Sequence, residues 1–228
     1  MTGAWGATVA KAFSAKWNKN EKLEKTSGLG TYNIVGFGLP ADYDFERDGV
    51  KYNTCPGALA CRGVCYAKQG GYRFPDSIAA RSHNLAFSQT DGFVAGIVSD
   101  LKRFRKANTV RIHDSGDFYS QEYFDKWCAI ANALPHLTFY AYTKSLTLDL
   151  AAAPANLKVT QSLGGKYDAS VDLDAPHSRI FSDHDARLAA GYVDGNLSDE
   201  PAIQGLIKIG LVYHGNKNLT ESQKVYFG

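Results

Sequence analysis

Three of the chain's four cysteines lie in one short loop, Cys55-x5-Cys61-x3-Cys65, which also contains Gly57 and Gly63. Thiolates are ligands for zinc and for iron–sulfur clusters, and glycines let a backbone curl so that several sulfurs converge. A structural zinc site normally takes four protein ligands, whereas this loop supplies three. We therefore expect an iron–sulfur cluster here, with one iron left open for chemistry. A zinc site and metal-free thiols are the alternatives.

The fourth cysteine, Cys128, follows Trp127 in a segment that Ser120 is expected to cap as a helix. It shares a face with Phe124 and Ala131, next to the main apolar stripe of that helix. Because a free cysteine often behaves as a small buried hydrophobe, we expect Cys128 in the core and not at a metal.

Polar residues and glycines follow five expected strands in succession. They are Asp114, Ser115, Gly116 and Asp117, then Lys144, then Ser162, then Asp183 and Asp185, and finally His214. Since the carboxyl ends of parallel strands meet at one edge, these groups are expected to line one pocket. Asp114, Lys144 and His214 are the catalytic candidates, with Ser162 beside them. Each element alone has a simpler reading, such as a turn that caps a helix or a structural histidine.

Hydrophobic patterning indicates the elements that would position these groups. Strands are expected at residues 32–39, 109–113, 136–142, 157–162, 179–182 and 207–213, and helices at 75–88, 92–106, after Ser120, and at 146–153. Strands separated by helices favour parallel pairing through βαβ units. We expect the α/β class with a partial (β/α)6 TIM-type barrel, and a doubly wound open sheet is the alternative.

The composition is that of a globular protein, with 228 residues, 44% hydrophobic, 21% charged and a net charge of +2. The charge neither requires nor excludes a nucleic-acid partner.

Residues 1–27 are expected to form an arm or a helix around Val9, Phe13 and Trp17, and residues 28–228 a single domain. No apolar run is long enough to span a membrane, and no signal-peptide pattern is evident, so a cytoplasmic location is expected. The sequence does not indicate the oligomeric state.

Three segments together resemble the bacteriophage gene product 88 family. They are the cysteine segment ending in Cys-Tyr-Ala (55–67), Arg-Ile-His-Asp-Ser-Gly-Asp-Phe (111–118) and Tyr-Ala-Tyr-Thr-Lys-Ser (140–145). Through related phage proteins this pattern is distantly similar to radical S-adenosylmethionine (SAM) enzymes, which are partial TIM barrels. The resemblance implies a [4Fe–4S] cluster and SAM as cofactors. Ser115, Gly116 and Asp117 would then hold the SAM amino group, with Tyr66 and Ser162 also at the cofactor. His113 or Asp114 as the fourth iron ligand is the alternative.

Three functions follow from these patterns. The first is a phage iron–sulfur enzyme, radical-SAM-like, that acts on a nucleotide or a nucleic-acid-related substrate. The second rests on the Asp114-Ser115-Gly116 turn, which resembles that of tRNA-guanine transglycosylases. It is a nucleobase-exchange enzyme with Asp114 as acid/base and Asp183 or Asp185 as nucleophile. The third is a non-catalytic metal-binding phage protein that engages a host partner.

Overall fold

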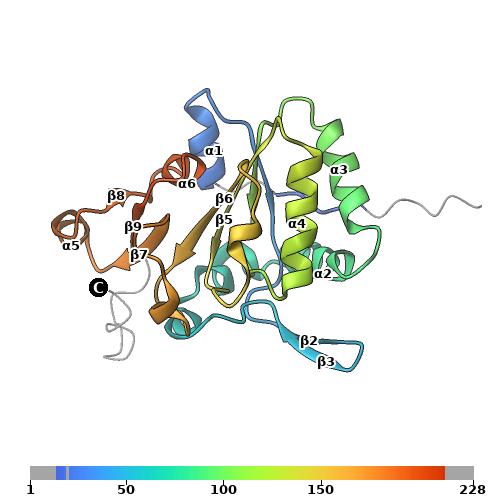
Figure 1. Ribbon diagram of the computed structural model, residues 1–228, viewed down its shortest axis with the longest axis horizontal. Helices are drawn as coiled ribbons and strands as arrows, with labels where there is room; N and C mark the ends of the chain where they lie inside the picture. Colours follow the sequence, from blue (N-terminus) through green and yellow to red (C-terminus); the bar gives the residue numbers. More distant parts are fainter. Residues whose placement is uncertain (1–13, 19–20, 214–228) are drawn as a thin grey trace, which may run out of the picture.

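Seven parallel strands form one sheet at the centre of the molecule, in the order β1-β4-β5-β6-β7-β9-β8 (Figure 1). The computed structural model describes residues 14–18 and 21–213. The strands of this sheet are β1 (Ile34–Phe37), β4 (Thr109–Ile112), β5 (Thr138–Thr143), β6 (Leu157–Ser162), β7 (His177–Phe181), β8 (Val193–Asp194) and β9 (Lys208–Val212). Every neighbouring pair in it is parallel, so the carboxyl ends of the strands share one edge.

Helices cover both faces of this sheet. They are α1 (Glu21–Gly28), α2 (Pro75–Ser88), α3 (Phe93–Arg103), α4 (Gln121–Ala133), α5 (His184–Ala189) and α6 (Glu200–Ile203), and short 3₁₀ turns lie between them. Figure 1 shows α3 and α4 side by side on one side of the sheet and α1 and α6 near the opposite side. Val110 and Ile112 of β4 pack with α3 and α4 in the main core, whereas Tyr140 of β5 packs with α1 and α6 in a second cluster.

The expected α/β class is confirmed, but the partial (β/α)6 TIM-type barrel is wrong. The sheet is open, and β5 reaches β6, and β6 reaches β7, through loops that contain only the 3₁₀ turns η4 (Leu150–Ala152) and η5 (Asp168–Ser170). A barrel fills its interior with side chains from its own strands. Here α1 and α6 pack on the face that a barrel would enclose. The helix expected at 146–153 is reduced to η4, so no layer of six outer helices forms.

A β-hairpin that the sequence analysis missed lies between β1 and the cysteines. β2 (Asp44–Arg47) and β3 (Val50–Asn53) pair in antiparallel fashion outside the main sheet. Their two-residue turn places Asp48 and Gly49 at φ angles of 54° and 76°. Aspartate and glycine are the residues that such a left-handed hairpin turn favours. The hairpin projects from the lower edge of the molecule in Figure 1.

The arm or helix expected at residues 1–27 lies only partly within the described residues. Val9 and Phe13 lie outside the described residues. Trp17 lies in an extended stretch, where Asn18 forms a bridge with Gly36 of β1, and the helix begins only at Glu21. In the described part of the chain, no helix combines the length and the apolar character that crossing a membrane requires.

Candidate functional site

The cysteine loop, residues 55–67, lies between β3 and α2 and joins the polar strand ends at the carboxyl edge of the sheet. The Asp117 amide, after β4, donates a hydrogen bond to the Thr54 carbonyl at 2.6 Å. The Lys166 amide, after β6, donates to the Gly57 carbonyl at 2.9 Å. The loop is therefore attached by backbone hydrogen bonds to the segments that follow two separate strands.

The three loop cysteines are half-buried. The Asp42 amide donates a hydrogen bond to the Cys55 sulfur at 3.3 Å. Burial raises the pKa of the Cys55 thiol to about 12, and burial also raises the pKa of Cys65. Because metals bind thiolates, Cys55 and Cys65 must each lose a proton before either can act as a ligand.

The sulfurs share one region but do not form a preassembled metal site. Among the described residues, no three His, Cys, Asp or Glu side chains are placed to hold a metal ion. Cys55 still lies close enough to Cys61 and Cys65 for negative charge on either to raise its pKa. The side chains must therefore move closer together before all three could share one metal or cluster.

Two glycines allow the loop to approach Lys144, which directly follows β5. A Cβ on Gly57 would overlap the carbonyl oxygen of Lys144. A Cβ on Gly165 would lie 2.7 Å from the Gly57 carbonyl oxygen, and Gly165 also forms an isolated antiparallel bridge with Ala58. Only hydrogen atoms fit between these backbones, which explains why glycine occupies both positions.

Lys144 and Ser162, both predicted as site residues, lie together in the structure. The Lys144 ammonium donates to the Ser162 hydroxyl at 2.6 Å and to the Leu163 carbonyl at 2.7 Å. Burial lowers the pKa of Lys144, although the nearby Cys61 and Asp117 act to raise it. A positive charge on Lys144 therefore lies beside the cysteine loop and close to its sulfurs.

Asp117, in the loop after β4, forms hydrogen bonds within that loop and to the end of β5. Its Oδ1 accepts hydrogen bonds from the Phe118 amide at 2.7 Å and the Thr143 hydroxyl at 2.6 Å. Its Oδ2 accepts from the Lys144 amide at 2.8 Å. Burial raises the pKa of Asp117. The carboxyl group thus has protein donors on both oxygens, and these bonds fix the loop after β4 against the end of β5.

Asp114, one residue beyond His113 at the end of β4, pairs with a cation that the sequence analysis missed. Its Oδ2 accepts from Arg81 of α2 at 3.0 Å and from the Tyr72 hydroxyl at 3.2 Å. Arg81 also donates to the Ser115 hydroxyl at 2.8 Å, and its guanidinium lies 4.3 Å from the centre of the Tyr72 ring. The sequence signal for this arrangement is the position of Asp114 just after a buried strand, because a buried carboxylate needs a countercharge.

The other predicted cofactor residues, Ser115, Gly116 and Tyr66, also contact protein groups. The Ser115 hydroxyl donates to the Leu39 carbonyl at 2.6 Å. Gly116 has a φ of 79°, and a Cβ there would lie 2.6 Å from the Leu39 side chain. The Tyr66 hydroxyl donates to the Asp114 carbonyl, and burial of this hydroxyl raises its pKa to about 12, although the residue as a whole is 58% exposed. These contacts hold the turn after β4 in place.

Other predicted residues lie elsewhere. His214 is outside the described residues. Asp183 and Asp185 are exposed, and Asp183 caps α5 by accepting from the Ala186 amide at 2.8 Å. Cys128 is buried in the main core, as predicted.

A buried ion cluster lies beneath the site, on the face of the sheet that α1 and α6 cover. Asp199, fully buried, accepts from Arg111 of β4 at 2.6 Å and from the Tyr140 hydroxyl at 2.8 Å. Lys22 of α1 lies 2.7 Å from the same carboxylate. The sequence gives little sign of this cluster, because its members are separated by up to 177 residues (22 to 199) and belong to no motif.

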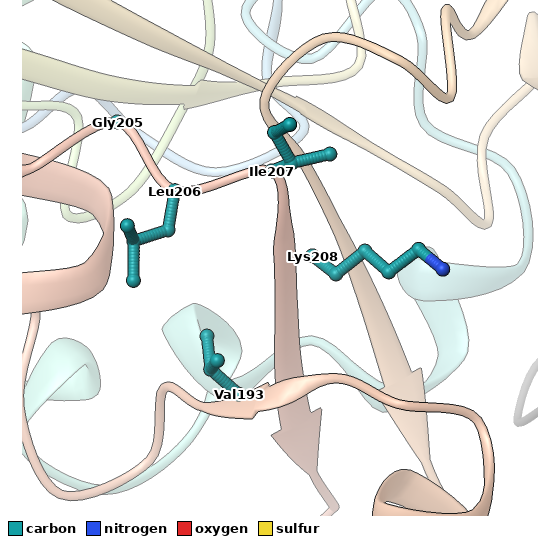
Figure 2. A pocket seen from close by; sticks show the side chains of 5 residues that line it. All are labelled: Val193, Gly205, Leu206, Ile207 and Lys208. Atoms are coloured by element: carbon teal, nitrogen blue, oxygen red, sulfur yellow. The ribbon is translucent and has the colours of Figure 1, made fainter.

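Two hollows on the described part of the surface are well defined by their linings, and one of them adjoins the cysteine loop. The first, of about 460 Å³, is lined by Val193, Gly205, Leu206, Ile207 and Lys208, and Figure 2 shows that these residues come from β8, the loop after α6 and the start of β9. It therefore lies at the amino end of β9, away from the polar strand ends. The second, of about 420 Å³, includes Ala67 at the end of the cysteine loop and Lys68 directly after it.

Comparison with known proteins decides the family. The family model described as "Gene product 88" matches residues 11–222 of this chain. The chain belongs to the Gene product 88 family. The match includes the cysteine loop and all the described polar strand ends, which confirms the expected family.

Two curated members of this family are similar to the chain over part of its length. The Gene 88 protein of Mycobacterium phage L5 is 29% identical, and that of Mycobacterium phage D29 is 27% identical, each over 163 residues. The aligned region covers 60% of this chain and 64% of each relative, so the chain matches less than two thirds of their length. No solved structure matches the chain.

Proposed function

We infer that this member of the Gene product 88 family is an iron–sulfur protein in which Cys55, Cys61 and Cys65 hold a [4Fe–4S] cluster. The observation that carries this proposal is the cysteine loop itself. Its three half-buried thiols lie in one loop that hydrogen bonds and close glycine packing attach to the carboxyl edge of the sheet.

The donor set fits an iron–sulfur cluster in chemistry and in number. All three donors are soft thiols, and they come from one segment of 11 residues (55 to 65). The amide of Asp42 already donates to the Cys55 sulfur, and amide hydrogen bonds to sulfur stabilise bound clusters and adjust their potentials. Binding requires the three sulfurs to move closer together than they lie in the described structure.

Lys144 would balance part of the negative charge that three thiolates bring. Its ammonium interacts with Cys61 and Cys55 and is held by the Ser162 hydroxyl. A fixed cation beside the loop would offset part of the charge of bound thiolates. Ser162 therefore positions the lysine beside the cysteine loop.

An iron with no protein ligand would supply a binding position for SAM or substrate and one-electron chemistry. Asp117 and Ser115, the residues expected to hold SAM, already accept or donate hydrogen bonds within the protein. Their part in this proposal is to fix the turn that faces the cysteine loop. SAM as a cofactor remains part of the proposal as the ligand of the open iron. A nucleotide-related substrate and a location in the host cytoplasm also remain parts of it, and the phage origin of the relatives supports these two.

Metal and sulfide analysis of anaerobically purified protein tests the proposal. We expect a brown protein with about four irons and an equal amount of acid-labile sulfide per chain. Replacement of Cys55, Cys61 or Cys65 by serine should remove most of the iron, whereas Cys128→Ser, in the core, should retain it. Zinc in place of iron, or equal iron in all four variants, would overturn the proposal. Added SAM should change the visible spectrum if it binds the open iron.

A further inference from the structure

The hollow beside the cysteine loop combines positive charge with apolar walls. Its lining consists of Pro40, Ala41, Ala67, Lys68, Tyr72, Arg73, Ile78 and Arg81. Its volume of about 420 Å³ is within the range of small-molecule sites. Three of the eight lining residues are cations, and none is acidic. The hollow in Figure 2 is different, since Lys208 is the one charged residue in its lining.

The three cations differ in how they are held. Arg81 is fixed by its ion pair with Asp114 at 3.0 Å and by its contact with the Tyr72 ring. Lys68 lies 2.8 Å from Asp42, a carboxylate that it shares with Arg62. One acidic group therefore serves two cations, so positive charge remains in excess around the hollow.

Arg73 is the cation most available to a ligand. It lies in the 3₁₀ turn η3 (Gly70–Arg73), its side chain is exposed, and the described contacts give it no ion-pair partner. Its guanidinium offers a fork of donors to a phosphate group. Arg81, whose three nitrogens already donate within the protein, adds positive charge to the same hollow. Arg73 in η3 and Arg81 in α2 line the same hollow.

Apolar groups complete the lining. Pro40, Ala41 and Ala67 provide small apolar contacts, and Ile78 is 53% exposed. Phe74 is next to Arg73 in the chain, outside this lining, and is 66% exposed. Exposed apolar side chains beside cations match a ligand with a flat, weakly polar ring and a charged phosphate.

From this lining we propose that the hollow binds a nucleoside phosphate, with the phosphate at Arg73 and Arg81 and the base against the apolar wall. Where the ligand is the substrate of the cluster, this rests on the proposed function and deepens it by giving its nucleotide-related substrate a binding site. Binding itself does not depend on iron. A free nucleotide, and not a nucleic-acid strand, matches a hollow of about 420 Å³.

Isothermal titration of the full chain with ATP, adenosine and inorganic phosphate tests this proposal. ATP should bind, and adenosine, which lacks the phosphate, should bind at least about tenfold more weakly. Inorganic phosphate should compete with ATP. Arg73→Glu should weaken ATP binding by about tenfold or more, because it reverses an exposed charge that contacts phosphate. Arg105→Glu, an equal charge change at an exposed site after α3, should leave it unchanged.

Equal ATP affinity in the Arg73→Glu and Arg105→Glu proteins would overturn the proposal. Binding of a single-stranded oligonucleotide without binding of ATP would also overturn it. The titration is done on iron-loaded and on iron-free protein. ATP binding by protein that takes up no iron keeps this inference and removes the proposed function. Iron-loaded protein that binds no ATP removes this inference alone.

Discussion

His113, the last residue before the Asp114 turn, combines a strained backbone with a buried ring. Its φ of 66° lies in the left-handed region, which is uncommon for histidine, and its side chain is only 4% exposed. Its Nε2 lies 2.9 Å from the Tyr123 hydroxyl, and its ring meets Phe118 edge to face at 4.7 Å. Burial, together with the charge of Arg111, lowers the pKa of His113 to about 3.

This burial predicts a specific pH dependence of stability. An unfolded histidine titrates near pH 6.5, so the folded protein binds fewer protons than the unfolded chain below that pH. Stability from His113 is therefore complete above pH 6.5 and is lost as the pH falls. Between pH 6.5 and 5 the loss should reach about 2 kcal/mol, measured by urea denaturation.

His113→Asn is the matched variant, because asparagine tolerates a left-handed backbone but does not titrate. It should be less stable at pH 7 and should lack most of this pH dependence. His136→Asn, at an exposed histidine, should behave like the parent. If the unfolding free energy of His113→Asn fell with pH as steeply as that of the parent, the buried His113 ring would not be the cause of this pH dependence. The sequence alone favours a structural role for any single histidine. The burial and the left-handed backbone of His113 are visible only in the structure.

At the scale of elements, the cysteine loop depends on how closely it packs against β5. Gly57→Ala should shift the loop, because the added methyl group overlaps the Lys144 carbonyl oxygen. Overpacking of this kind costs about 1–3 kcal/mol. We expect a lower free energy of unfolding and a lower iron content after anaerobic reconstitution.

Gly28→Ala is the control for this substitution, since no atom lies within 4 Å of its added Cβ. It should leave both the unfolding free energy and the iron content close to those of the parent. If Gly57→Ala retained full stability and full iron, the loop would not be held against β5 as described.

Several elements were predictable because their signals are local. Pro75 begins α2, and Ser120 caps α4 by accepting from the Tyr123 amide at 3.2 Å. The hairpin of β2 and β3 was missed although Asp48-Gly49 is a strong turn signal. The helix expected at 146–153 is wrong, since the structure has only the short 3₁₀ turn η4 there. Local pattern could not show that the loop before β6 packs without a full helix.

At the scale of the whole molecule, the ion cluster around Asp199 joins α1, β4, β5 and the start of α6. Asp199→Asn should leave Arg111 and Lys22 without their shared countercharge in a buried position. Removal of one partner from a buried ion pair costs about 3–5 kcal/mol. We expect a loss of this size in the unfolding free energy measured with urea.

Glu122→Gln provides the comparison at the surface. Glu122 pairs with Arg47 and Lys126, but its side chain is 52% exposed. Exposed pairs contribute about 0–1 kcal/mol, so this variant should lose little. Equal, small losses in both variants would mean that the cluster does not hold α1 and α6 on the sheet.

The open sheet explains why the barrel prediction failed while the parallel sheet was predicted correctly. Alternating strands and helices indicate parallel pairing, but closure depends on what packs on the inner face. That face is covered by α6, four residues long, and by α1, whose buried apolar contact is Leu23. Helices so short or so polar leave no clear periodic signal. The polar strand ends, in contrast, were found because parallel strands must end at one edge.

The most direct test of the three-thiol site is iron K-edge X-ray absorption of protein prepared without oxygen. We predict sulfur neighbours around iron and iron–iron scattering, both lost when Cys55, Cys61 and Cys65 are all replaced by serine and both retained in Cys128→Ser. Iron surrounded by oxygen or nitrogen alone, or a spectrum unchanged by the triple replacement, would contradict this account.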